Sequence, residues 1–131
     1  MIVHDLSPEA VRKMIPVDLA NATEEPPSPI GNFDFHDCVG GVGSFIGRPP
    51  WELHADDDEL LLVLAGECQL TVREDGGELS RTLRTGDLAI VPRGCWHSND
   101  APGGVTILFM TPRDGNRHSW ADPAGPTQPV R

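Results

Sequence analysis

The sequence predicts a single all-β domain that closes into a small barrel behind a short N-terminal helix. Its 131 residues fit one domain with one hydrophobic core. Fourteen glycines and thirteen prolines separate short apolar segments, which is typical of a chain with many turns. Between residues 33 and 111 these segments are β-rich and regularly interrupted, as in sandwiches and barrels. We expect a barrel because closure removes exposed sheet edges.

The first part of the chain predicts a helix and then a linker. Residues 7–9 read Ser-Pro-Glu, which combines a preferred N-cap, a proline at the first helical position and an acid in the first turn. The helix is expected to reach about Ile15, because Pro16 cannot continue it. Residues 24–32 are rich in proline and turn-forming residues, so residues 1–32 are predicted to be an N-terminal extension and linker.

The barrel itself is predicted to occupy residues 33–111. Asp-Gly-Gly at 75–77 predicts a tight hairpin, and further turns are predicted at 85–87 and 92–94. Gly66 is expected to separate two strands. The strands that the pattern predicts are 33–38, 42–46, 50–54, 59–65, 67–74, 79–85, 87–91, 96–100 and 104–111. The Pro/Gly-rich tail at residues 112–131 is expected to be loose or draped over a neighbour.

The net charge and the cysteine content indicate which binding partners and which cellular compartment the protein is suited to. The formal net charge of −10 is a poor match for nucleic acid or an anionic membrane. The three cysteines include no CxxC pair, and an odd number of cysteines does not form a closed disulfide framework. The N-terminal sequence lacks the build of a signal peptide. We therefore expect a reduced, cytoplasmic, soluble protein.

Candidate metal ligands begin in the segment at residues 51–59. Glu52 and His54 are two residues apart on a predicted strand, so their side chains point to the same face. If residues 55–58 form a hairpin loop, Glu59 lies opposite His54, with Cβ atoms about 4.5–5.5 Å apart. That separation suits two side chains that bind one ion.

The second group of candidate residues follows a strand and a Pro-Arg-Gly turn at 92–94. His97 begins the returning strand and would supply a second imidazole nitrogen. Two histidines and one carboxylate on rigid strands form a pattern typical of non-haem Fe(II) sites. The same ligands also suit Zn, Ni or Mn, so the sequence leaves the identity of the divalent metal open.

These residues resemble the two motifs of the cupin superfamily, G-x5-H-x-H-x3,4-E-x6-G and G-x5-P-x-G-x2-H-x3-N. The matching positions are Gly47, His54, Glu59 and Gly66 in the first motif, and Gly86, Pro92, Gly94 and His97 in the second. The resemblance implies a double-stranded β-helix, also called a jelly roll, over about residues 33–111. It also implies a divalent metal ion at His54, Glu59 and His97, and a homodimer.

Three positions depart from these motifs. Glu52 replaces the first histidine, Gly47 is one residue closer than expected, and Asn99 is two rather than four residues after His97. Glu52 is therefore either a fourth metal ligand, a general base, or a solvated carboxylate that only supports a ligand. The acid-x-His, Glu, His order is also similar to that of the cupin-like 3-hydroxyanthranilate dioxygenases, a local likeness that transfers no substrate.

Other polar residues are expected to have ordinary structural roles. His36 would be an acid or base only if its strand face lines the cavity, and Asp56-Asp57-Asp58 reads as a solvated loop because the EF-hand pattern fails. Buried packing is expected for the cysteines, and solvent for His4 and His118. Trp51 and Trp96 alternate away from the ligand face and are expected to pack outside the cavity.

Two function classes remain open from the sequence. The first is a metal-dependent enzyme, either a dioxygenase or an isomerase or lyase, acting on a small polar metabolite, with Glu52 and His97 as its catalytic residues. The second is a non-catalytic module that binds a small molecule. The absence of tyrosine, and a single lysine at Lys13, argue against Tyr and Schiff-base chemistry.

Overall fold

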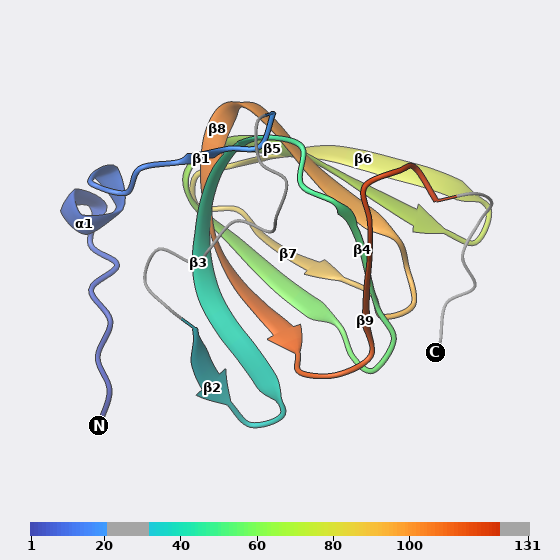
Figure 1. Ribbon diagram of the computed structural model, residues 1–131, viewed down its shortest axis with the longest axis horizontal. Helices are drawn as coiled ribbons and strands as arrows, with labels where there is room; N and C mark the ends of the chain where they lie inside the picture. The colour runs from blue at the N-terminus through green and yellow to red at the C-terminus, as the bar shows by residue number, and fades with distance from the viewer. Residues whose placement is uncertain (21–31, 124–131) are drawn as a thin grey trace.

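The computed structural model describes residues 1–20 and 32–123, so all of the predicted linker at 24–32 except Asn32 lies outside the described residues. Within them the chain forms one short helix and nine strands that curl into a barrel (Figure 1). The elements are α1 (Pro8–Arg12), β1 (Val17–Asp18), β2 (Phe33–Phe35), β3 (Cys38–Gly47), β4 (Trp51–His54), β5 (Glu59–Glu74), β6 (Gly77–Arg84), β7 (Leu88–Val91), β8 (His97–Pro112) and β9 (Asn116–Ser119).

The barrel consists of two sheets that share the long strands β5 and β8. In the first sheet, the C-terminal half of β8 lies between β3 and the N-terminal half of β5, and β7 pairs with β5 on its other side. In the second sheet, the N-terminal half of β8 pairs with the C-terminal half of β5, which pairs with β6. β4 joins this sheet between β8 and β9. The predicted jelly-roll fold is therefore confirmed.

β5 and β8 are longer than predicted, because residues that the pattern read as breaks continue the strands. The expected break at Gly66 is instead an irregularity inside β5, where the register against β8 shifts. Gly66 has φ +76° and lies against Gly104, which has φ +94°. These irregularities occur where β5 and β8 pass from one sheet into the other, so the glycines bend the strands rather than end them.

The hydrophobic core lies between the two sheets. Alternate residues of β5 point inward, so Leu61 and Val63 from the first sheet meet Leu70 and Val72 from the second. Ile107 of β8 joins the same cluster. The expected hairpin between β5 and β6 is confirmed, with Glu74 paired to Gly77 around a two-residue turn.

The N-terminal helix begins as predicted but is shorter. Ser7 caps it, since its hydroxyl accepts a hydrogen bond from the amide of Ala10 at 3.3 Å. It ends at Arg12 rather than near Ile15, which agrees with the restriction that Pro16 places on the residue before it. Over residues 1–20 and 32–123, no helix is long and apolar enough to cross a membrane.

Of the two alternatives for the C-terminal tail, the loose one does not hold for residues 116–119, and the strand that they form was not predicted. They form β9, which pairs antiparallel with β4 along its whole length, from Trp51 opposite Ser119 to His54 opposite Asn116. Figure 1 shows β9 beside β4. The segment was missed because Asn-Arg-His-Ser carries no apolar alternation, and it is β4 that gives the strand its hydrogen-bond partners.

Candidate metal centre

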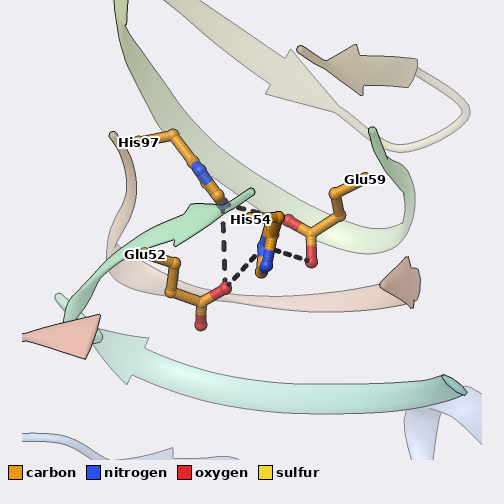
Figure 2. Close-up of side chains that lie close together, drawn as sticks. All are labelled: Glu52, His54, Glu59 and His97. Carbon is orange, nitrogen blue, oxygen red and sulfur yellow. Dashed lines mark hydrogen bonds and ion pairs between the residues drawn. The ribbon is translucent and has the colours of Figure 1, made fainter. Parts of the chain in front are cut away.

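Four side chains from three strands converge inside the barrel (Figure 2). They are Glu52 and His54 of β4, Glu59 at the start of β5 and His97 at the start of β8. One ligand atom from each residue lies within 4.8 Å of the others. The structure thus brings together all four residues that the sequence proposed as metal ligands.

The route by which they meet differs from the expected hairpin. β4 belongs to the second sheet, whereas the N-terminal half of β5, which carries Glu59, belongs to the first. Glu59 therefore lies opposite Val91, and His54 lies opposite Asn116. Glu52 is paired with His97 across β4 and β8. His54 and Glu59 therefore approach each other across the space between the sheets, and not along one ladder.

Backbone contacts tie the two motif segments together at the centre. The amide of Gly94 donates to the carbonyl of His54 at 2.7 Å, and the amide of Arg93 donates to the carboxylate of Asp58 at 2.9 Å. The Pro-Arg-Gly turn is therefore fixed to the end of β4 and to the loop before β5. His97 follows this turn by three residues, so the same contacts fix the distance between the two histidines.

Glu59 is the central member of the cluster. Its Oε1 lies 3.0 Å from Nε2 of His97, and its Oε2 lies 3.4 Å from Nε2 of His54. Thr111 of β8 donates its hydroxyl to Oε2 at 2.5 Å. Glu52 approaches from the other side, with Oε2 3.3 Å from Nε2 of His54 and 3.7 Å from Nε2 of His97. Both imidazoles thus direct Nε2 at the same two carboxylates.

Hydrogen bonds on the far side of His54 determine which nitrogen faces the cluster. Its Nδ1 lies 2.7 Å from Oδ1 of Asn116, and the amide nitrogen of Asn116 donates to the carbonyl of Pro112 at 2.7 Å. Because the oxygen of Asn116 can only accept, Nδ1 of His54 carries the proton. Nε2 of His54 then faces the carboxylates of Glu52 and Glu59 at 3.3 and 3.4 Å, and this buried atom has no hydrogen-bond partner.

His97 has the same arrangement. Its Nδ1 lies 3.4 Å from the carbonyl of Cys95, which is an acceptor only, so Nε2 is again the nitrogen that faces the carboxylates. The residue is completely buried, at 0% exposure. A lone pair aimed at a carboxylate is repulsive unless a proton or a metal ion lies between them. Both histidines therefore direct Nε2 at the carboxylates that they share, the orientation that a metal ion bound there would require.

The electrostatics of the cluster attract positive charge. Burial disfavours the protonated form of His54, but the carboxylates of Glu52 and Glu59 outweigh burial and raise the pKa of His54 to about 10. Burial also disfavours ionised Glu59, yet the imidazoles of His54 and His97 lower the pKa of Glu59 below its ordinary value. A divalent cation would neutralise the same two carboxylates. Two imidazole nitrogens and two carboxylates fit Fe, Zn, Ni or Mn.

A cavity of about 370 Å³ adjoins the cluster. Glu52, His54 and Glu59 form its polar end. The remaining walls combine apolar side chains with polar groups. The apolar side chains include Val39, Phe45, Leu61, Ile107 and Phe109, and the polar ones include Asn99, Arg113, Asn116 and His118. This volume admits a small metabolite, and its walls suit a ligand with both an apolar part and an oxygen-bearing head.

Three residues of the site were missed or misplaced by the sequence reasoning. Asn116 bonds to His54, Thr111 bonds to Glu59, and His118 lines the cavity with its Nε2 3.7 Å from Oε1 of Glu52. His118 was expected to lie in solvent, and its side chain is 38% exposed, but its place in the cavity wall was not foreseen. The only available signal was the alternation of Asn116 and His118 in a segment that was not predicted to be a strand.

Other candidate residues lie outside the cluster. His36 is exposed in the turn after β2, with φ +54° and its ring 4.8 Å from Phe35, and it is not among the residues that line the cavity beside the cluster. Cys68 and Cys95 are buried core residues, and burial raises the pKa of the Cys68 thiol to about 11. Trp51 is buried with the guanidinium of Arg73 4.3 Å from its ring centre, which places it away from the ligands as expected.

Comparison with known proteins connects this geometry to one family. Residues 47–111 match the family model described as a cupin domain. No curated protein sequence matches the chain significantly.

The fold is also found in solved structures. A cupin-2 domain protein from Shewanella frigidimarina is 27% identical, with a TM-score of 0.56 over 71% of this chain and 84% of that one. A protein with a double-stranded β-helix domain from Klebsiella pneumoniae is 19% identical, with a TM-score of 0.58 over 75% and 87%. Hydroquinone 1,2-dioxygenase from Sphingomonas is 16% identical, with a TM-score of 0.55 over 72% and 71%. The last two likenesses establish the fold alone.

Proposed function

Because the chain belongs to the cupin superfamily, we propose that it is a metal-dependent enzyme that acts on a small molecule bound in the cavity beside Glu52, His54, Glu59 and His97. The observation that carries this proposal is the orientation of the two buried histidines. Each has Nδ1 against an acceptor and Nε2 against the shared carboxylates. This arrangement favours a divalent cation at the centre.

The protein's own residues have separable roles in this proposal. His54, Glu59 and His97 hold the ion from buried positions, which excludes water from that side. Glu52 faces the cavity with 29% of its side chain exposed, so it can bind the ion through Oε2 or take a proton from a bound ligand. The apolar walls orient the ligand. The ion, when bound, would supply Lewis acidity or, as Fe(II), redox chemistry with dioxygen.

Oxygenation by an Fe(II) enzyme is the reaction that we propose to test first. A 2-His-carboxylate set is typical of non-haem Fe(II) sites, and the Sphingomonas protein with the same fold is a hydroquinone 1,2-dioxygenase. Isomerase or lyase chemistry with Zn, Ni or Mn is the second choice, since the same ligands serve those ions. The alternative is that the protein is not an enzyme and binds a small molecule without converting it.

Elemental analysis of untagged protein tests the proposal. We expect near-stoichiometric divalent metal in the wild type and less than about a tenth of it in His97→Ala, because the variant loses one of the two buried imidazole ligands. His36→Ala is the matched control, since His36 is exposed and outside the cluster. Circular dichroism would check that the barrel remains folded.

The metal found decides the next experiment. Iron would lead to oxygen-consumption assays with ring diols, and zinc or nickel to assays with keto acids and sugars. If the wild type binds no metal even after reconstitution, the metalloenzyme proposal is wrong. Ligand binding without product across that screen would instead support the non-catalytic module.

We also propose that the protein is a homodimer that pairs through the outer face of the first sheet. Leu60 of β5 is in register with Ile90 and Met110, and Leu62 with Leu88 and Leu108, so two apolar rows cross three strands. Leu88 and Ile90 are 56% and 53% exposed. A continuous apolar face of this kind is typical of an interface.

Light scattering after gel filtration tests the dimer. We expect twice the monomer mass for the wild type and monomer mass for Ile90→Lys, because a lysine would have to be buried without a partner charge. Leu79→Lys is the control, because Leu79 is 61% exposed on β6 in the other sheet. A monomeric wild type would contradict this interface.

A further inference from the structure

The strand β9 lies outside the part of the chain that matches the cupin family model, which ends at residue 111. Among residues 1–20 and 32–123, its four residues pair with β4 alone, the strand that carries Glu52 and His54. Asn116 and His118 alternate onto the same side of β9, and both line the cavity. The C-terminal strand therefore brings two polar side chains to the centre that the family match does not include.

The contact between β9 and the centre is a chain of directed hydrogen bonds. The amide nitrogen of Asn116 donates to the carbonyl of Pro112 at 2.7 Å, which fixes the orientation of the side-chain amide. Its oxygen then faces Nδ1 of His54 at 2.7 Å. Backbone bonds hold the same corner, since the amide of Ala55 donates to the carbonyl of Gly115 at 3.1 Å.

We propose that Asn116 is a positioning residue of the metal centre, which holds His54 with its proton on Nδ1 and its Nε2 lone pair toward the ion. This inference rests on the proposed function, because it gives β9 a role in the same site. A ligand histidine is commonly oriented by an acceptor on its other nitrogen, and loss of that acceptor costs about 10- to 100-fold in metal affinity.

The remainder of the site agrees with this role. Nδ1 of His54 has Asn116 as its hydrogen-bond partner. Because His54 is buried, water has little access to take the place of this acceptor if Asn116 is replaced. His97 has a weaker bond on its far side, 3.4 Å to the carbonyl of Cys95. The contact between Asn116 and His54 is thus the shorter of the two contacts that orient the histidines.

Metal affinity of three variants of the full chain tests the inference, measured by competition of Zn(II) and Co(II) against a chelator. Asn116→Leu keeps the branching and the number of side-chain heavy atoms and removes the acceptor, so we expect affinity to fall about 10- to 100-fold. Asn116→Asp keeps an acceptor toward Nδ1 of His54 but loses the hydrogen bond to the carbonyl of Pro112, so it should bind more tightly than Asn116→Leu. Arg117→Leu changes the neighbouring exposed residue on the opposite face and should leave the affinity unchanged.

A spectroscopic readout separates positioning from a general loss of structure. In Co(II)-loaded wild type, proton NMR should show two exchangeable, paramagnetically shifted Nδ1–H signals, one from each ligand histidine. In Asn116→Leu we expect one of them to broaden through exchange with water, and in Asn116→Asp we expect both to persist. Thermal unfolding of the metal-free proteins would show whether the barrel itself is retained.

The results distinguish this inference from the proposed function. Wild-type protein that binds neither ion overturns both. Wild-type protein that binds while Asn116→Leu binds within twofold of it, with both Nδ1–H signals intact, overturns only the role of Asn116. A loss in Asn116→Leu that Asn116→Asp restores supports the positioning role.

Discussion

We expect the substitution Glu59→Gln to lower the affinity for a divalent metal by about 100-fold or more. Loss of a residue that only orients a metal ligand typically lowers metal affinity by about 10- to 100-fold, and Glu59 is itself a proposed ligand. Glu59 contacts Nε2 of both histidines, so removal of its charge acts on the whole centre. The neutral amide would also donate to the Nε2 lone pair of His97 and occupy the position that the ion needs.

The fold should survive this change. Glutamine has the shape of glutamate, and its carbonyl oxygen can still accept the hydroxyl of Thr111, which bonds to Glu59 at 2.5 Å. Both polar atoms of the new side chain then keep a partner. Isothermal titration with Zn(II) would measure the affinity, and urea unfolding would verify that the barrel is intact.

Glu52→Gln is the matched comparison. It removes the other carboxylate of the cluster, but Glu52 lies 3.7 Å from His97 and is partly exposed to the cavity. We expect the loss of affinity to be about tenfold and therefore smaller than for Glu59→Gln. An equal or larger loss in Glu52→Gln would contradict the central position assigned to Glu59.

The local sequence predicted which residues form the centre, because the motifs specify residue types at fixed spacings. Glu52 and His54 needed only strand alternation to share a face. The contact between His54 and Glu59 was predicted for the wrong reason, since a hairpin loop was assumed where the chain crosses from one sheet to the other. Spacing along a chain does not show which sheet each strand joins.

The second layer of the site could not be predicted from spacing. Asn116 is 62 residues from His54 along the chain, and its strand exists because β4 pairs with it. Similarly, a glycine such as Gly66 can end a strand or bend it. The choice depends on Gly104, which approaches from β8 and has no local relation to Gly66.

The bend at Gly66 leads to the largest effect on stability that we expect. In Gly66→Ala the new Cβ would lie 2.3 Å from the carbonyl oxygen of Gly104, which is backbone and cannot turn aside. The residue also has φ +76°, which costs an L-residue about 1–2 kcal/mol. Together the clash and the strain should lower the free energy of unfolding by about 3–5 kcal/mol, a large fraction of a typical domain's stability.

Gly76→Ala separates the two causes. Gly76 has φ +94° in the hairpin turn between β5 and β6, but a Cβ there would meet no atom within 4 Å. It should therefore show the backbone cost alone, about 1–2 kcal/mol. Urea unfolding of both variants measures the difference. Equal losses in the two would mean that β5 can move away from Gly104 without cost, and the bend would then not depend on close contact between the strands. A larger loss in Gly66→Ala would show that this contact holds β5 and β8 in the bend that carries each strand from one sheet into the other.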